Sequence, residues 1–167
     1  MRRRPGRATS SLIEYVDLYP TLAELAGLPA PAYLAGRSFA AILRDPAHPG
    51  REFALSQFSR PFSAGAPQAM GYSIRTATHR YTRWVDWPAR QTTAEELYDY
   101  TAPASAEPRW TTFVERRNVL GEPAYAAVRD ALRTKMDQVL RERSVVAPAR
   151  QTGEGAEATK RKKKRQN

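Results

Sequence analysis

Few side chains of this sequence are of the types that attack substrates, bind metals or transfer protons. The chain has 167 residues, no cysteine and two histidines, so disulfides, thiolate chemistry and cysteine-ligated metals are excluded. His48 lies among Pro46, Pro49 and Gly50, and His79 falls at the tip of an expected hairpin. We expect both imidazoles to face solvent. No two aspartates are adjacent, and we expect neither a catalytic residue nor a metal ligand in this chain.

Aromatic side chains offer a different kind of chemistry. Tyr81, Trp84 and Trp87 could form a platform for a sugar, because aromatic faces bind pyranose rings. At strand spacing, aromatic residues more often pack in the core or at its rim, and we favour that interpretation here. Arg75 also lies in a strand pattern, where a charged side chain covers the solvent face or finds a structural partner.

Strands and one long helix would have to position these residues. Alternating apolar and polar residues predict a small antiparallel sheet. The expected strand regions are 52–58, a hairpin from 70 to 86 connected by 77–79, and 96–100. A helix is expected over 123–143, and its apolar face consists of Val128, Leu132, Met136, Val139 and Leu140. Burying each of these side chains would contribute about 1.5–3 kcal/mol before entropy is subtracted, which is enough to dock the helix on the sheet.

Two shorter helices are expected before the sheet. Asp17 is placed to cap the first helix, which Gly27 would end in the left-handed conformation. Its apolar stripe is Leu18, Leu22 and Leu25. Ser38 is placed to cap the second helix, which ends before Pro46. The chain thus predicts an α+β fold in which a small four-stranded antiparallel sheet is packed by a C-terminal helix.

The basic charge is concentrated at the two ends of the chain. The formal net charge is +10, and ten of the 27 Lys and Arg residues lie at positions 2–7 and 160–165. The remaining 17 basic residues balance 17 acidic ones. A basic tail can bind nucleic acid or be a solvated extension. Because no aromatic residue is interleaved with this tail, we favour the extension.

Four segments resemble one family, in the family's own order. They are 16–29, 54–61, the two strands of the expected hairpin (70–76 and 80–85), and 96–99. Together they are similar to the C-terminal portion of sulfatases, in particular the iduronate-2-sulfatase-like type. The resemblance implies the C-terminal subdomain of the alkaline-phosphatase-like sulfatase fold. The expected parts are a flexible basic lead-in (1–9), a helical remnant of the large α/β domain (10–50), the C-terminal subdomain (51–146) and a disordered basic tail (147–167).

The resemblance also implies a reaction, whose chemical groups this sequence lacks. The resemblance implies that a complete enzyme would hydrolyse sulfate esters of sulfated sugars through a formylglycine nucleophile and calcium. Formylglycine forms from Cys or Ser in the pattern Cys/Ser-x-Pro-x-Arg. Ser59 begins Ser-x-Pro, but Ser63 stands where Arg is required. We therefore expect this chain alone to be inactive, with calcium and formylglycine only in a missing catalytic half.

Arg60 is the best candidate for a substrate-binding side chain under this resemblance. The matching Arg-Pro of the family lies near the mouth of the cleft, where a guanidinium could bind the carboxylate of an acidic sugar through two parallel hydrogen bonds. Alternatively, Arg60 pairs with an acidic residue of the missing large domain and holds the two parts together. Met70 and the loop 62–69 could border the same sugar pocket at the cleft rim.

Other functions and partners follow from the same observations. The chain could be a non-catalytic glycan-binding module, could complement a separately encoded catalytic half, or could associate with nucleic acid through its tail. No apolar run is long enough for a membrane span, and no signal-peptide core follows the basic N-terminus. As written, the chain is expected in the cytoplasm, whereas a complete family member would be periplasmic, secreted or lysosomal.

Overall fold

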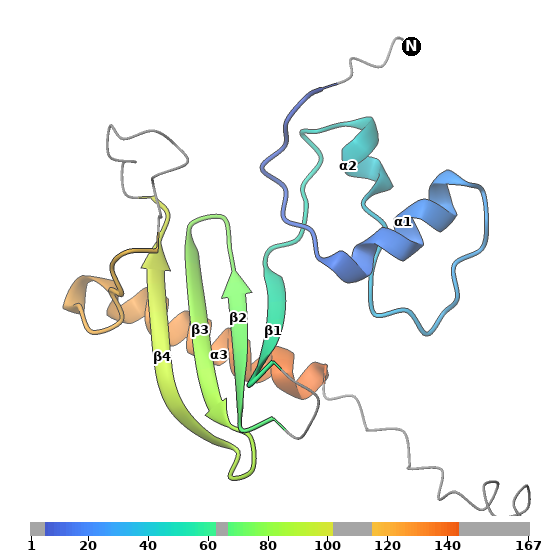
Figure 1. The fold of residues 1–167 in the computed structure, drawn as a ribbon. Coiled ribbons are helices and arrows are strands. Elements are labelled where there is room, and N and C mark those ends of the chain that lie inside the picture. The colour runs from blue at the N-terminus through green and yellow to red at the C-terminus, as the bar shows by residue number, and fades with distance from the viewer. Residues whose placement is uncertain (1–5, 63–66, 102–114, 144–167) are drawn as a thin grey trace, which may run out of the picture. The chain divides into compact units, whose positions relative to one another are not determined.

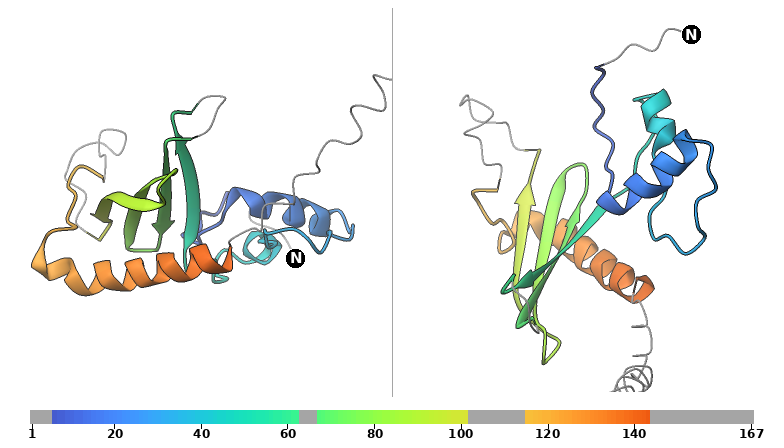
Figure 2. Two further views of the ribbon diagram at one scale, coloured as in Figure 1. Left: turned by 90° about the horizontal axis from the view of Figure 1, so that it is seen from below. Right: turned by 45° about the vertical axis from the view of Figure 1, so that its right-hand side comes forward.

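A four-stranded antiparallel sheet is the central element of the computed structural model, which describes residues 6–62, 67–101 and 115–143 (Figure 1). The strands lie in the order β1-β2-β3-β4, so each strand pairs with the next along the chain. Their bounds are Ala54–Arg60 (β1), Ala69–Arg75 (β2), His79–Asp86 (β3) and Gln91–Asp99 (β4). Figure 2 shows the twist of this sheet from two further directions. The expected α+β class and four-stranded sheet are confirmed.

The register places one apolar row across all four strands. Leu55, Ile74, Tyr81 and Leu97 are paired in turn. The last three are fully buried. Each large apolar side chain buried in this way contributes about 1.5–3 kcal/mol before entropy is subtracted. This row is the core face of the sheet.

A long helix, α3 (Ala126–Glu142), follows a short 3₁₀ turn at Pro123–Tyr125. The chain forms two compact units that divide at Arg133, so α3 contributes to both. In the first unit, Leu132 is buried and Arg133 bonds to Glu95 of β4, which joins the first half of α3 to the sheet. In the second unit, Met136 and Val139 are buried. The predicted apolar face of the helix is thereby confirmed at these three positions.

Two short helices precede the sheet: α1 (Leu18–Leu25), which follows a 3₁₀ turn at Tyr15–Asp17, and α2 (Ala40–Arg44). Gly27 has a φ of 69° after the end of α1, as predicted. Asp17 is at the N-cap of α1, as predicted, but its side chain makes no capping hydrogen bond there. Ser38 Oγ accepts a bond from Ala40 N at 3.1 Å, although the cap residue itself is Phe39.

The free edge of β4 is partly covered by the segment that leads to α3. The Asn118 side chain accepts a hydrogen bond from Leu97 N at 2.9 Å, and Val119 N donates to Leu97 O at 2.9 Å. Val119 is 5% exposed. Pairing of an edge strand satisfies backbone groups that would otherwise attract other chains. Residues 1–5 of the basic lead-in and the whole predicted tail (147–167) lie outside the described residues.

Candidate functional site

The sheet face opposite the core row carries a cluster that we call the arginine–aromatic surface. It consists of the exposed Phe58, Arg60 and Phe62 and the half-buried Trp84. Phe58 and Arg60 are two positions apart on β1 and so share a face. The rings of Phe58 and Phe62 stack, with centroids 5.4 Å apart and planes at 2°. Phe58 is 41% exposed and Phe62 is 78% exposed. Phe62, two residues after the end of β1, therefore extends the aromatic surface.

The Arg60 guanidinium lies on aromatic rings. Its guanidinium carbon is 4.7 Å from the Phe58 centroid and 5.9 Å from the Trp84 centroid. Among the described residues, the guanidinium makes no hydrogen bond and no ion pair. Cation–π contacts hold a guanidinium by its face, so its N–H groups stay available at the edge. Arg60 is thus an oriented, exposed donor for an anion.

Met70, the second residue expected at a substrate cleft, lies on the other face of the sheet. It is 6% exposed, and its Sδ accepts a hydrogen bond from Gln57 Nε2 at 3.3 Å. Met70 pairs with Ser59, the neighbour of Arg60 on β1. The structure therefore places Arg60 at the surface and Met70 in the core. Residues 63–66 of the loop between them lie outside the described residues.

A buried ion pair near α1 is the strongest electrostatic feature that sequence reasoning missed. Arg51 bonds Asp17 through Nε, at 2.7 Å from Oδ2, and through Nη2. Asp17 also accepts bonds from the backbone N–H groups of Glu14 and Arg37, each at 2.9 Å. Burial raises the pKa of Asp17, but the Arg51 and backbone hydrogen bonds outweigh it, and the pKa falls to about 2. Asp17 is therefore a structural anion that is already fully bonded.

Gly36 is the residue in the sequence that could have indicated the close approach of its segment to Val16 and Asp17. A Cβ at Gly36 would lie 1.9 Å from the carbonyl oxygen of Val16. Only glycine lets the backbone pass so near, and this passage brings Arg37 N to Asp17. A cavity of about 170 Å³ lies beside this cluster and is lined in part by Asp17, Arg37 and Arg51.

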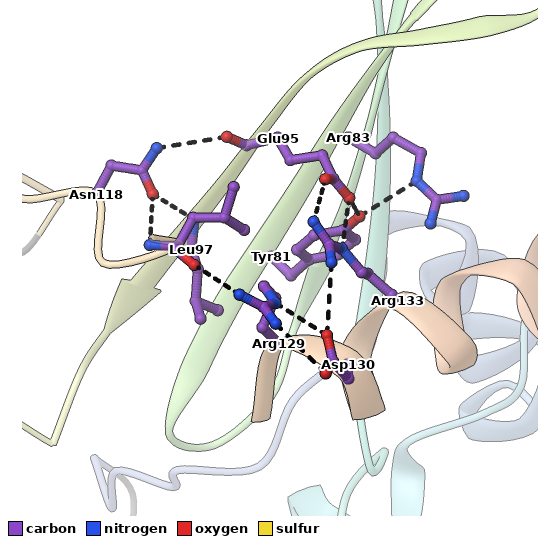
Figure 3. Close-up of polar contacts among 9 residues, drawn as sticks. Tyr81, Arg83, Glu95, Leu97, Asn118, Arg129, Asp130 and Arg133 are labelled. Carbon is purple, nitrogen blue, oxygen red and sulfur yellow. Dashed lines mark hydrogen bonds and ion pairs between the residues drawn. The ribbon is translucent and has the colours of Figure 1, made fainter. Parts of the chain in front are cut away.

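A second polar cluster joins β3, β4 and α3 (Figure 3). Arg133 Nε donates to Glu95 Oε1 at 2.9 Å, and the Tyr81 hydroxyl donates to the same carboxylate. Arg83 Nε donates to the Tyr81 hydroxyl at 3.2 Å. The bond from Arg133 lowers the pKa of Glu95, whereas burial and the bond to Glu95 raise the pKa of Tyr81. These directions keep Glu95 ionised and Tyr81 protonated, as the hydrogen bonds require.

The two histidines differ from each other. His48 is exposed, as predicted, and its Nδ1 lies 2.9 Å from the Pro49 carbonyl oxygen. The prediction for His79 is wrong, because its side chain is only 14% exposed and its Nε2 lies 3.8 Å from Asp99 Oδ1. Its ring also meets Tyr125 edge-on, with centroids 6.2 Å apart. Asp99 and Tyr125 are remote in sequence, so no local pattern indicates this enclosure.

No metal site forms among the described residues, where no three His, Asp or Glu side chains come together. The buried acidic pair, Glu14 and Asp17, is engaged by Arg51. The residues of this part of the chain therefore do not fit a calcium site, and Ser59 is a strand residue paired with Met70. No helix of the described segments is long and apolar enough to cross a membrane.

Known proteins with similar sequences and folds are sulfatases. Human iduronate 2-sulfatase is 39% identical over 111 residues, and the mouse enzyme is 38% identical over 112. Each match covers 48% of this chain and 20% of the relative. The chain thus spans about a fifth of the length of the curated relatives it matches. No family model matches the sequence.

Solved structures lead to the same group of enzymes. A sulfatase structure from Bacteroides thetaiotaomicron matches with a TM-score of 0.57 and 26% identity, covering 75% of this chain and 24% of that one. A 2-O GAG sulfatase structure matches with the same TM-score, identity and coverage. In sequence and in fold, the chain is therefore sulfatase-like and corresponds to the C-terminal portion of enzymes of the iduronate-2-sulfatase type.

Proposed function

We propose that this chain forms the C-terminal subdomain of an enzyme that hydrolyses sulfate esters of sugars. In this proposal, a catalytic half supplies the formylglycine nucleophile and the calcium, and the chain by itself is inactive. The relatives support this assignment because their names describe sulfatases acting on iduronate and on glycosaminoglycans. The chain spans about a fifth of the iduronate 2-sulfatases, which is consistent with a subdomain role.

The observation that carries the proposal is the unpaired guanidinium of Arg60. It is exposed and lies on Phe58 and Trp84, with no acceptor among the described residues. A planar guanidinium matches the two oxygens of a carboxylate or sulfate, and the resulting charge-assisted bonds are about twice as strong as neutral ones. Arg60 at the cleft rim would bind the acidic group of the sugar, with Met70 supporting β2 beneath it.

A catalytic half as partner is supported by an exposed apolar surface on α1. Leu18, Leu22 and Leu25 are 41%, 64% and 48% exposed. The buried residues of the same helix are Pro20 and Thr21. Exposed apolar patches of this kind mark interaction sites in soluble proteins. We propose that this surface packs on the large domain of the sulfatase.

The proposal is tested first with the purified chain and an aryl sulfate such as 4-nitrophenyl sulfate. We expect no turnover above the buffer rate, and no change in Ser59→Ala, because the sequence has no Cys/Ser-x-Pro-x-Arg pattern from which a formylglycine nucleophile could form. Turnover that Ser59→Ala abolishes would overturn the proposed division between this chain and a catalytic half.

Complementation tests the positive part of the proposal. A sulfatase catalytic half produced without its own C-terminal subdomain should gain activity on a sulfated uronic-acid disaccharide when this chain is added. Arg60→Gln should then raise KM about tenfold while kcat changes little, because the lost contact lies outside the reacting bond. Arg117→Gln, at a side chain that is 77% exposed in a surface pair, is the matched control.

The other candidate is a glycan-binding module without a catalytic partner, and the same unpaired Arg60 favours it. The complementation experiment separates the two candidates. If the chain binds sulfated sugar through Arg60 but never restores activity, the binding module is the better account.

A further inference from the structure

Trp84 occupies an unusual position on the open face of the sheet. Phe58, Gly71, Trp84 and Ala94 form one row across the four strands. A Cβ at Gly71 would lie 2.9 Å from Cζ3 of Trp84 and 3.1 Å from both Cε3 and Cη2. Three neighbouring atoms of the six-membered ring are thus almost equally near one backbone position. The indole therefore lies flat on β2, with one face on Gly71 and the other turned away from the strand.

The polar edge of this indole is already bonded. Trp84 Nε1 donates to Glu96 Oε1 at 3.0 Å, and the Tyr98 hydroxyl donates to Glu96 Oε2 at 3.0 Å. Glu96 is two residues from Tyr98 on β4, so both bonds come from the same sheet face. They fix the orientation of the ring. Trp84 is half-buried, and its outer face is the part of the ring that is not held by Gly71 or Glu96.

Three other aromatic residues in or beside the sheet are less available for stacking. Tyr81 is fully buried. The ring of Trp87 is covered by the Arg90 guanidinium at 3.5 Å, and the ring of Tyr100 by that of Arg75 at 3.5 Å. The cation nearest to the Trp84 ring, Arg60, is 5.9 Å from its centroid. The structure thus separates Trp84 from the aromatic residues that serve packing.

We propose that Trp84 is a stacking subsite for one pyranose ring, whose carboxylate or sulfate is bound by Arg60. The inference rests on the proposed function for the class of ligand, an anionic sugar. Charge complementarity supports this occupant, because the guanidinium beside the ring has no anionic partner in the part of the chain that the structure describes. The apolar face of a pyranose fits an indole, and its hydroxyls would meet the adjacent polar row of Ser56, Ser73 and Thr82, which crosses the same face.

Binding of a heparin-derived tetrasaccharide to the full chain tests this subsite, with isothermal titration calorimetry as the measurement. Trp84→Leu keeps an apolar side chain but removes the ring face, and we expect about tenfold weaker binding. Gly71→Ala should have a similar effect, because its Cβ would displace the ring. Arg60→Gln should weaken binding about tenfold or more. Near-UV circular dichroism checks that each variant keeps its fold.

Two controls separate this subsite from general attraction to the basic chain. Trp87→Leu should bind like the wild type, because its ring is covered by Arg90. Replacing the six basic residues at 160–165 with Gln should leave the differences between variants unchanged. Carboxyl-reduced and desulfated tetrasaccharides show which anionic group Arg60 binds, since only the removal of that group mimics Arg60→Gln.

The outcomes distinguish this inference from the proposed function. Binding that falls in Arg60→Gln, Trp84→Leu and Gly71→Ala supports the subsite. Binding that needs Arg60 but is unchanged in Trp84→Leu overturns the stacking subsite alone. Binding that is unchanged in both variants, or is lost only with the basic tail, overturns the subsite and removes the sugar-binding role of Arg60 as well.

Discussion

Asp17 connects three segments that are far apart in the sequence. Its carboxylate bonds to Arg51 and to the backbone of Glu14 and Arg37, and it is 1% exposed. Thr21 continues this arrangement, because its hydroxyl donates to Asp17 O and accepts from Phe39 N at 3.0 Å. A buried charge held by this many donors is costly to disturb, since removing it leaves Arg51 without its partner.

We expect Asp17→Asn to lower the free energy of local opening in this region by about 3 kcal/mol. This corresponds to roughly a hundredfold loss of amide protection. Hydrogen exchange at the amides of Arg37 and Phe39 measures the effect locally. The control is Glu24→Gln, which breaks a pair with Arg44 whose side chains are 42% and 55% exposed. Exposed pairs contribute about 0–1 kcal/mol, so this variant should stay close to the wild type. Equal losses in both variants would contradict the structural role of Asp17.

Lowering the pH should reproduce this loss of amide protection in the wild-type chain, because it protonates Asp17. The pKa of Asp17 falls from 3.8 to about 2 in the folded chain. A lowered folded-state pKa adds stability above pH 4, and this stability is lost as the pH falls from about 4 to 2. The shift corresponds to about 2 kcal/mol. Protection of the Arg37 amide should therefore decline over this range in the wild type and be low throughout in Asp17→Asn.

The first half of α3 is attached to the sheet by one well-defined contact. Glu95 accepts bonds from Arg133 and from the buried Tyr81. Glu95 and Arg133 have side chains that are 18% and 36% exposed, so solvent screens the pair only in part. This contact lies between the fully buried ion pair of Asp17 and the surface pairs, and its contribution should lie between theirs.

Glu95→Gln should therefore cost about 1–2 kcal/mol, because it removes the charge that Arg133 needs but keeps a hydrogen-bond acceptor for Tyr81. Amide protection at Leu97 and Leu132 should fall about tenfold, and the Asp17 region should not change. Arg117→Gln, which breaks the exposed pair with Glu122, is the control. A loss confined to the amides of α1 would contradict this assignment.

Local patterns were enough to predict the elements that depend on neighbouring residues. The hairpin was expected with its connection at 77–79, and the structure ends β2 at Arg75 and begins β3 at His79. The helix expected over 123–143 is observed as a 3₁₀ turn followed by α3. β4 begins at Gln91, five residues before the expected Glu96. The sequence did not indicate this earlier start, because the first residues of the strand are exposed and do not alternate between apolar and polar.

Contacts between distant segments could not be predicted in this way. Arg51 was not a candidate for any role, since nothing near it in sequence indicates a partner 34 residues away. Arg60 was chosen from a family resemblance, but its place between Phe58 and Trp84 depends on strand register. The flat indole on Gly71 depends on register as well, because these residues face each other across β2 and β3.

At the scale of the molecule, the described residues include more exposed large apolar side chains near the N-terminal helices than at the sheet. Besides the leucines of α1, Tyr15, Tyr19, Leu28 and Tyr33 are between 59% and 92% exposed. The sheet instead has a continuous buried row. We therefore expect the sheet to be stable in the isolated chain and the α1 region to open at lower temperature, which gives weak cooperativity on heating.

The same surface should make the isolated chain self-associate as its concentration rises, because apolar patches left in water attract one another. The double variant Leu22→Lys and Leu25→Lys should lower this association, measured by sedimentation velocity, without lowering the melting temperature of the sheet. Ile74→Lys is the contrasting change, since a charge at this fully buried position should unfold the sheet. A wild-type chain that stays monomeric and melts in one sharp transition would show that α1 needs no covering partner. If the double variant fails to bind a sulfatase catalytic half while the wild-type chain binds it, self-association and complementation depend on the same surface of α1.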